Sequence, residues 1–317
     1  MGIDPTARLR KVDVVMRITE RAVRTHPLGE WALLRRVMPD GGSSEPDPRR
    51  FMPDKGSSLG LDDLGFMPDI GNHVVSSTAR YPVMSAAENL VGAAQVHSAT
   101  FCEGRIATGS VGTLCRSAIE SSAKTIWLLG DVSREVRRAR CLGFIERERS
   151  YQKPFIDIEE EIFAIRTDPA KTIEYQGFQR HRAEYDKRQN AITSLPQDAR
   201  QKPPRKFEKV VAWAAEWIDD NPPPHATNEL GLGMALGAKS FYAFGSSFVH
   251  GYKWMSDYVK DDTELLRMIA DGFAAALIMT ECAVALFEAR SSNPARAAVR
   301  KKNYPERLTT TVDAWGP

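Results

Sequence analysis

Helical periodicity is the feature of the sequence that most constrains the fold. From Tyr81 to about Arg290, apolar residues recur at the three- and four-residue spacing of an α-helix, and the alternation typical of strands is nearly absent. Helix signals punctuate this stretch: Asp261 begins a capping box, and the proline-rich Asn221–Pro224 is a firm stop. The sequence therefore predicts an all-α fold, a multi-helix bundle over residues 81–290.

Composition supports a large globular core and excludes several kinds of site. The chain has 317 residues, 42% of them hydrophobic, and a formal net charge of +2, which requires neither a nucleic-acid nor a membrane partner. No P-loop, dinucleotide fingerprint, serine-hydrolase elbow or zinc-protease motif occurs, so we expect no cofactor and no metal. The cysteines have neither disulfide-type nor zinc-type spacing, and we expect reduced, mostly buried thiols: Cys102, Cys115, Cys141 and Cys282.

The most apolar stretch, Phe273–Phe287, is short for a bilayer span and contains Glu281. We therefore expect it to be a buried core helix. No secretory-signal pattern stands near the start of the sequence. The expected location is the cytoplasm, without a membrane partner.

Three flanking regions have distinct compositions. Residues 1–36 begin with a basic amphipathic helix that we expect to dock on the bundle, with binding of RNA or acidic lipid as the alternative. Residues 37–80 form a turn-rich loop with three related units, VMPDGGSS, FMPDKGSS and FMPDIGN. These units are expected to lie over the bundle, and a multivalent linear motif is the alternative. Residues 291–317 form a basic tail that we expect to be loosely ordered.

Several residues in the helical region carry specific expectations. A helix is expected from Tyr81, with Pro82 in its first turn and His97 packed and hydrogen-bonded near the core. His225, beside the proline stop, is expected to be exposed. An arginine-rich helix capped by Ser133 carries two candidate phosphate-binding residues, Arg137 and Arg138, although its interleaved glutamates favour an ion-paired solvent face.

The segment KSFYAFGSSFVHGYKW (Lys239–Trp254) places polar residues within an otherwise apolar helix. Tyr242, Ser246 and His250 follow one another at four-residue spacing and so share one stripe. Glycines on a neighbouring face predict a close approach of another helix, and we expect this contact at Gly237 in particular.

A second polar stripe, Arg116 and Glu120, lies on the helix expected over 107–129. If the two helices are neighbours, Glu120 orients the imidazole of His250, Arg116 holds an anionic group, and His250 exchanges protons near neutral pH. Tyr242, Ser246 and Ser247 complete this candidate catalytic and binding site. The alternative is a buried hydrogen-bond network with a purely structural role.

The pair GTLCRSAIESSAKTIWLL and FYAFGSSFVHG resembles the arrangement in a group of bacterial, often actinobacterial, helical proteins. Those proteins are similar to the HEPN superfamily, all-helical and often dimeric bundles that include metal-independent ribonucleases of toxin and defence systems. The resemblance implies His250 as a catalytic residue with Ser246 as its companion. The arginine that the superfamily carries, separated from this histidine by four to six intervening residues, is missing here, where Ala243, Phe244 and Gly245 stand.

Three functions remain open from the sequence, and the third of them, a small-molecule-binding regulator, is a distant one. The first is a non-catalytic helical interaction or regulatory protein with a HEPN-like bundle. The alternative is a HEPN-like metal-independent ribonuclease. In the first two cases we expect a homodimer, and RNA is the candidate ligand of the second.

Overall fold

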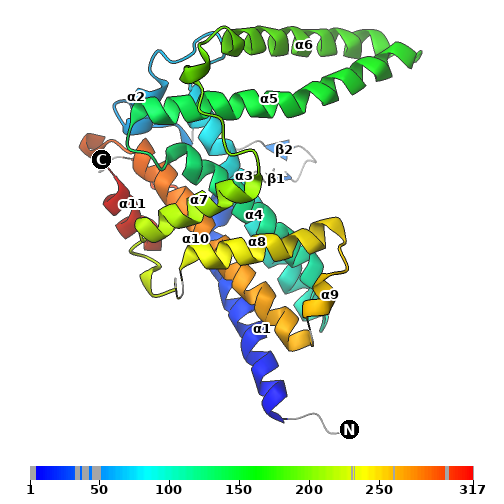
Figure 1. The fold of residues 1–317 in the computed structure, drawn as a ribbon, viewed down its shortest axis with the longest axis vertical. Coiled ribbons are helices and arrows are strands. Elements are labelled where there is room, and N and C mark those ends of the chain that lie inside the picture. Colours follow the sequence, from blue (N-terminus) through cyan, green and yellow to red (C-terminus); the bar gives the residue numbers. More distant parts are fainter. Residues whose placement is uncertain are drawn as a thin grey trace.

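The computed structural model of the protein describes residues 5–32, 36–37, 43–44, 51–229, 231, 233–259, 261–296 and 300–316. In these residues the fold is all-α apart from a two-residue antiparallel pair of strands, so the all-α prediction is confirmed (Figure 1). The strands are β1 (Arg36–Val37) and β2 (Ser43–Ser44). The helices are α1 (Pro5–Thr25), α2 (Ser58–Asp63), α3 (Val74–Cys102), α4 (Thr108–Leu129), α5 (Arg134–Ile165), α6 (Lys171–Thr193), α7 (Phe207–Asp220), α8 (Met234–His250), α9 (Met255–Tyr258), α10 (Asp262–Ser291) and α11 (Thr309–Trp315). The 3-10 turns are η1 (His26–Trp31), η3 (Gln197–Ala199), η4 (Thr227–Glu229), η5 (Pro294–Arg296) and η6 (Glu306–Leu308).

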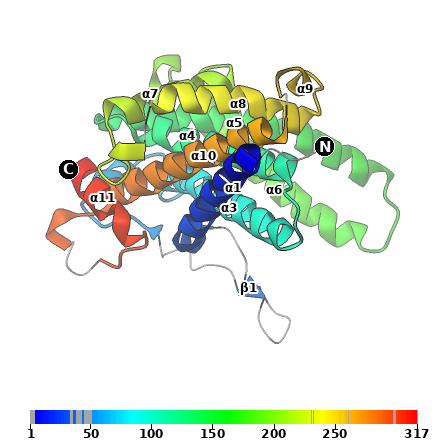
Figure 2. The same cartoon turned by 90° about the horizontal axis from the view of Figure 1, so that it is seen from below.

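Helix α10 is the centre of the bundle. Its residues 275–289 are all buried, and it packs against α1, α3, α4, α8 and α11 (Figures 1 and 2). The helix begins where the sequence predicts, because the Asp261 carboxylate accepts hydrogen bonds from the backbone amides of Thr263 and Glu264. By length and composition α10 is able to cross a membrane, but 89% of its apolar window is buried inside the protein. It is thus the core helix expected from the sequence.

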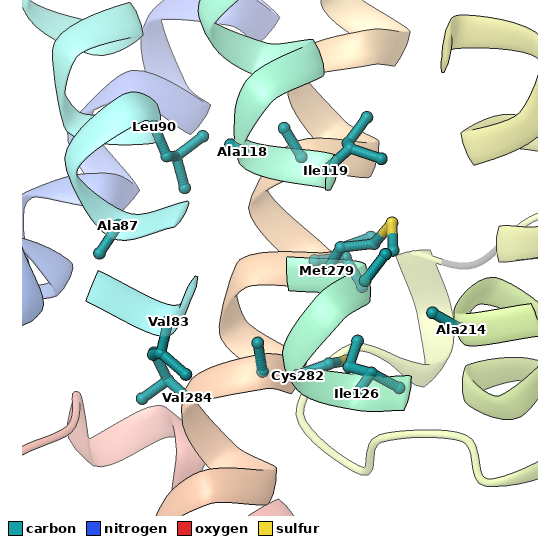
Figure 3. Packing of buried hydrophobic residues seen from close by; sticks show 14 of the residues in the cluster. Val83, Ala87, Leu90, Ala118, Ile119, Ile126, Ala214, Met279, Cys282 and Val284 are labelled. Atoms are coloured by element: carbon teal, nitrogen blue, oxygen red, sulfur yellow. The ribbon is translucent and has the colours of Figure 1, made fainter. Parts of the chain in front are cut away.

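Helices α3, α4 and α10 share one interdigitated core (Figure 3). Leu90 of α3, Ile119 of α4 and Met279 of α10 are fully buried there, and Ala118 lies between the larger side chains. Burying each large apolar side chain stabilises the fold by about 1.5–3 kcal/mol. We call the bundle of α1, α3, α4, α7, α8 and α10 the body.

Glycines let α8 approach its neighbours, but not at the expected residue. Gly237 is exposed, and a Cβ added there would meet nothing within 4 Å, so the predicted contact at Gly237 is wrong. The close approaches of α8 to its neighbours lie at two other glycines, one on α10 and one on α8. A Cβ on Gly272 of α10 would lie 1.9 Å from the ring of Phe241, and one on Gly245 would lie 3.0 Å from the side chain of Arg116. Of these two glycines, the one that permits the closer approach is therefore Gly272 of α10, the helix against which α8 packs.

Helix α3 begins seven residues before the position that the sequence suggests. Its first turn is held by Asp63, whose carboxylate accepts hydrogen bonds from the backbone amides of Val75 and Ser76 at 2.8 and 3.1 Å. This cap comes from the end of α2, eleven residues before Val74, and local periodicity does not reveal it. Pro82 consequently lies buried inside the helix rather than in its first turn.

The described residues of the turn-rich region lie over the bundle, as expected. Its first unit lies largely outside the described residues. In the second unit, Phe51 is buried and stacks on Trp31 with ring centroids 4.1 Å apart, and Ser57 caps α2. In the third, a turn joins the amide of Ile70 to the carbonyl of Met67, and Ile70 is buried. The second and third units therefore pack against the fold.

The described residues of the C-terminal tail pack against the bundle, contrary to the expectation of a loosely ordered tail. Arg300 lies 3.1 Å from the carboxylate of Glu288 on α10, and Leu308 and Val312 are buried against the bundle. Two basic residues of the tail, Arg300 and Arg307, pair with buried glutamates of α10, a match that composition alone does not show.

A helical hairpin projects from the body. It consists of the second half of α5 and all of α6, and both views show it extending past the other helices (Figures 1 and 2). Its apolar contacts form a small cluster of their own, separate from the main core: Ile156, Phe163, Phe178 and Tyr185, with Tyr175 beside them. We call residues 150–193 the arm.

Candidate functional site

The two polar stripes predicted from the sequence do meet, at the crossing of α4 and α8. The absence of a side chain at Gly245 lets the aliphatic stem of Arg116 pack directly against α8. The guanidinium of Arg116 then lies over the ring of Tyr242, 4.2 Å from its centroid, and its Nε donates to the carbonyl of Tyr242 at 3.4 Å. Sequence spacing thus predicted the correct pair of helices.

Glu120 completes this cluster. Its Oε2 accepts a hydrogen bond from the Tyr242 hydroxyl at 3.3 Å and lies 3.7 Å from Nη1 of Arg116. Lys124, one turn further along α4, approaches Oε1 at 3.8 Å. We call Arg116, Glu120, Lys124 and Tyr242 the α4–α8 cluster. With two cations around one carboxylate, the cluster carries a formal net charge of +1.

The phenol of Tyr242 remains protonated in this setting. Burial, together with the carboxylate of Glu120, raises the pKa of Tyr242 to about 12, against the opposing effect of Arg116. At neutral pH the hydroxyl is therefore a hydrogen-bond donor and not a base. The contacts of the cluster hold α4 and α8 together at their crossing.

His250 stands apart from the cluster. It lies eight residues beyond Tyr242 on α8, about 12 Å along the helix axis. Its ring is exposed and lies 5.3 Å from that of Tyr252, and within the described residues it makes no hydrogen bond or ion pair. The expected network joining Glu120 to His250 is therefore not formed.

The two serines of the stripe differ from each other. Ser246 donates to the carbonyl of Tyr242 at 3.3 Å, an i to i−4 bond within the helix. The hydroxyl of Ser247 is buried and has no hydrogen-bond partner among the described residues. Neither hydroxyl approaches the imidazole of His250 within hydrogen-bonding distance in this structure.

Arg137 and Arg138 hold the turn-rich region in place. Arg137 is buried and grips the carboxylate of Asp62 through Nε at 2.6 Å and Nη2 at 2.7 Å. Arg138 donates to the carbonyls of Asp62 and Leu64, and its guanidinium lies 4.8 Å from the ring centroid of Phe66. Hydrogen bonds within the chain occupy Nε, Nη1 and Nη2 of Arg137 and Nε and Nη2 of Arg138, so the geometry favours a structural role for both over phosphate binding.

Sequence reasoning missed a buried charge centre on α10. The carboxylate of Glu281 is fully buried and receives hydrogen bonds from Arg24 of α1 at 2.9 Å and from Nε of Arg307 at 2.7 Å. Nε2 of His225 donates to it at 3.2 Å, and Nδ1 of His225 lies 2.7 Å from the hydroxyl of Thr311. Only 1% of the His225 side chain is exposed, contrary to the expectation of an exposed histidine. The one signal in the sequence was a glutamate inside an apolar helix.

This charge centre connects distant parts of the chain through one ionised carboxylate. Burial by itself raises the pKa of Glu281. The hydrogen bond from His225 and the guanidinium groups of Arg307 and Arg24 have the larger opposite effect, so the pKa lies below its ordinary value. The carboxylate is therefore ionised and neutralised by its partners. Three segments far apart in the sequence meet on one residue of the core helix.

Other expectations concern single residues. His97 is buried, and its Nε2 lies 3.1 Å from the hydroxyl of Thr19, which confirms a packed, hydrogen-bonded histidine. Three of the four cysteines are buried, as expected, whereas Cys102 is exposed. In the described part of the chain, no cluster of three or more His, Cys, Asp or Glu side chains is placed to hold a metal ion.

Comparison with known proteins returns no relatives: no family model matches the chain, nor does any curated protein or solved structure.

Proposed function

We propose that the protein is a non-catalytic helical interaction protein and that the arm is the surface through which it acts. One observation carries this proposal. Five large apolar side chains on the outer side of α5 are between 40% and 80% exposed: Tyr151, Phe155, Ile158, Ile162 and Ile165. We call these five residues the α5 stripe.

The spacing within the α5 stripe is typical of a helix that packs against another helix. Successive members are separated by four, three, four and three residues, the a/d pattern of a heptad. A contiguous apolar surface of this kind is costly to leave in water, and on soluble proteins it marks an interaction site. No helix of the described chain covers it, since α6 packs on the side of α5 that carries Ile156 and Phe163.

The second candidate function is HEPN-like, metal-independent cleavage of RNA, and one observation favours it. The imidazole of His250 is exposed and makes no hydrogen bond or ion pair with any described residue, so both ring nitrogens are accessible for proton transfer to a bound molecule. Cleavage also needs a cation for the charge on the phosphorane. The nearest candidate suggested by the sequence, Arg116, is engaged with Tyr242 and Glu120, so the interaction function has the stronger support.

The experiment that separates the two is an RNA-cleavage assay. Purified protein is incubated with structured and total RNA in the presence of EDTA, alongside His250→Ala and, as the matched control on the same helix, Ser247→Ala. We expect no cleavage above the buffer control for any of the three proteins. Cleavage by the unmodified protein that disappears in His250→Ala and persists in Ser247→Ala would overturn the interaction proposal.

A further inference from the structure

The arm is only half of a helical bundle. Its own apolar cluster is small, with four buried residues, whereas the α5 stripe and Ile173 of α6, which is 76% exposed, remain uncovered. An isolated two-helix hairpin buries one face of each helix and normally needs further helices to complete a core. The structure therefore shows an apolar surface on the arm that no described residue covers.

A groove runs along the arm between α5 and α6. It has a volume of about 630 Å³, and its lining includes the aromatic residues Phe155, Phe163, Phe178 and Tyr185. Phe155 belongs both to this groove and to the α5 stripe, so the two features form one continuous surface. Its width, spanning two helices, suits an additional helix lying along the hairpin.

The two helices of the arm carry opposite charge. Between residues 150 and 165, α5 has four carboxylates and one lysine, whereas α6 has five lysines and arginines and three carboxylates. Some of these charges pair within the arm, for example Glu160 with Arg182. Others make no ion pair with any described residue: Glu159 and Glu161 on α5, and Arg180 and Lys187 on α6.

We infer that the arm is completed by the arm of a second copy of this chain, with α5 of each copy lying against α6 of the other around a twofold axis. This inference rests on the proposed function and names its partner. The charges favour this occupant: Glu159 and Glu161 of one copy face the unpaired cations of the other, and both contacts form at once in an isologous pair. Direct packing of α5 on α5 would instead oppose acidic flanks, which heptad pairing disfavours.

The size of the surface fits this arrangement. A stable interface buries about 800 Å² on each partner. The arm offers six large apolar side chains that are 40% to 80% exposed, together with the groove beside them. The two arms together form a four-helix bundle, in which the α5 stripe of each copy lies along the groove of the other.

The test is charge exchange, read by sedimentation velocity over a wide concentration series. The first variant carries Glu159→Lys and Glu161→Lys, and the second carries Arg180→Glu and Lys187→Glu. We expect the unmodified chain to dimerise and each variant alone to have a dissociation constant raised about tenfold or more, equivalent to about 1.4 kcal/mol. An equimolar mixture of the two variants should recover the dimer, because each α5–α6 contact then joins opposite charges.

Three results would overturn the inference: an unmodified chain that is monomeric throughout, a second variant that dimerises as well as the unmodified chain, or a mixture that stays monomeric. Unchanged dimerisation of the second variant would indicate α5–α5 packing, because the charges on α6 would then make no contact across the interface. Far-UV circular dichroism of both variants shows whether the helices are intact. None of these results bears on RNA cleavage, so failure of this inference is separate from failure of the proposed function.

Discussion

The body and the arm are both helical, but they differ in whether their charged side chains are paired and their apolar side chains are buried. In the body, Glu281 is buried and paired with three partners, and Phe273 and Phe287 are fully covered. In the arm, Glu161 is exposed without an ion pair to any described residue, and Ile165 is 80% exposed. The buried charge and the large core side chains of the body are satisfied within one chain, whereas no described residue covers the α5 stripe of the arm.

The largest expected effect breaks the charge centre of the body. Glu281→Gln removes the buried carboxylate shared by Arg24 and Arg307, although Arg24 keeps its ion pair with Glu229. Removing one partner of a buried pair costs about 3–5 kcal/mol. Urea denaturation measures the loss in the free energy of unfolding. The matched control, Glu161→Gln in the arm, should change that free energy by no more than about 0.5 kcal/mol. Equal effects of the two variants would contradict the contrast between body and arm.

The next effect tests the packing of α8 on α10 within the body. In Gly272→Ala the new Cβ meets the ring of Phe241, and overpacking of this kind costs about 1–3 kcal/mol. Gly237→Ala, at an exposed helical position with open space, should instead stabilise the protein by up to about 1 kcal/mol. Thermal melting measures both. Shifts of the same sign would show that the assignment of the close contact to Gly272 is wrong.

Helices and their caps were largely predictable because the signals are local. The helix expected over 107–129 is α4, which begins one residue later, and the caps at Asp261 and Ser133 form as the spacing indicates. The start of α3 was missed because its cap, Asp63, comes from another helix. Local periodicity carries no information about such a partner.

The candidate site was predictable only in part, for the same reason. Four-residue spacing placed Arg116 and Glu120 on one face of α4 and Tyr242 on the facing side of α8, and these residues do meet. The same spacing also put His250 on this face of α8. Residues on one face extend along the whole helix, however, whereas two crossing helices are in contact only near the crossing point. The crossing lies at Tyr242 and Gly245, which leaves the end of α8 outside the cluster.

A smaller effect follows from the limited extent of the α4–α8 cluster. In a double-mutant cycle, Glu120→Gln and Tyr242→Phe should couple by about 0.5–1.5 kcal/mol, the usual net contribution of a hydrogen bond. Glu120→Gln and His250→Ala should show no coupling, since no contact joins them. Measurable coupling in the second cycle would place His250 in the same network as Glu120, against the geometry described above.

The smallest expected effect is a pH dependence that comes from His97. Burial lowers the pKa of His97, so the folded protein binds fewer protons than the unfolded chain as the pH falls below about 6.5. The contribution of His97 to stability is therefore present above that pH and is lost as the pH falls. The free energy of unfolding should decline less between about pH 7 and pH 5 in His97→Gln than in the unmodified protein. His181→Gln, an exposed position in the arm, should leave the decline unchanged.

The measurement that tests the central claim most directly is amide hydrogen exchange at low and high protein concentration. If the arm is completed by a second copy, peptides from residues 150–193 should exchange more slowly as the concentration rises, while peptides from α10 remain equally protected throughout. Ile158→Glu, which places a charge in the α5 stripe, should abolish this change and leave the protection of α10 as it was. Arm exchange that is independent of concentration in the unmodified protein would contradict the account.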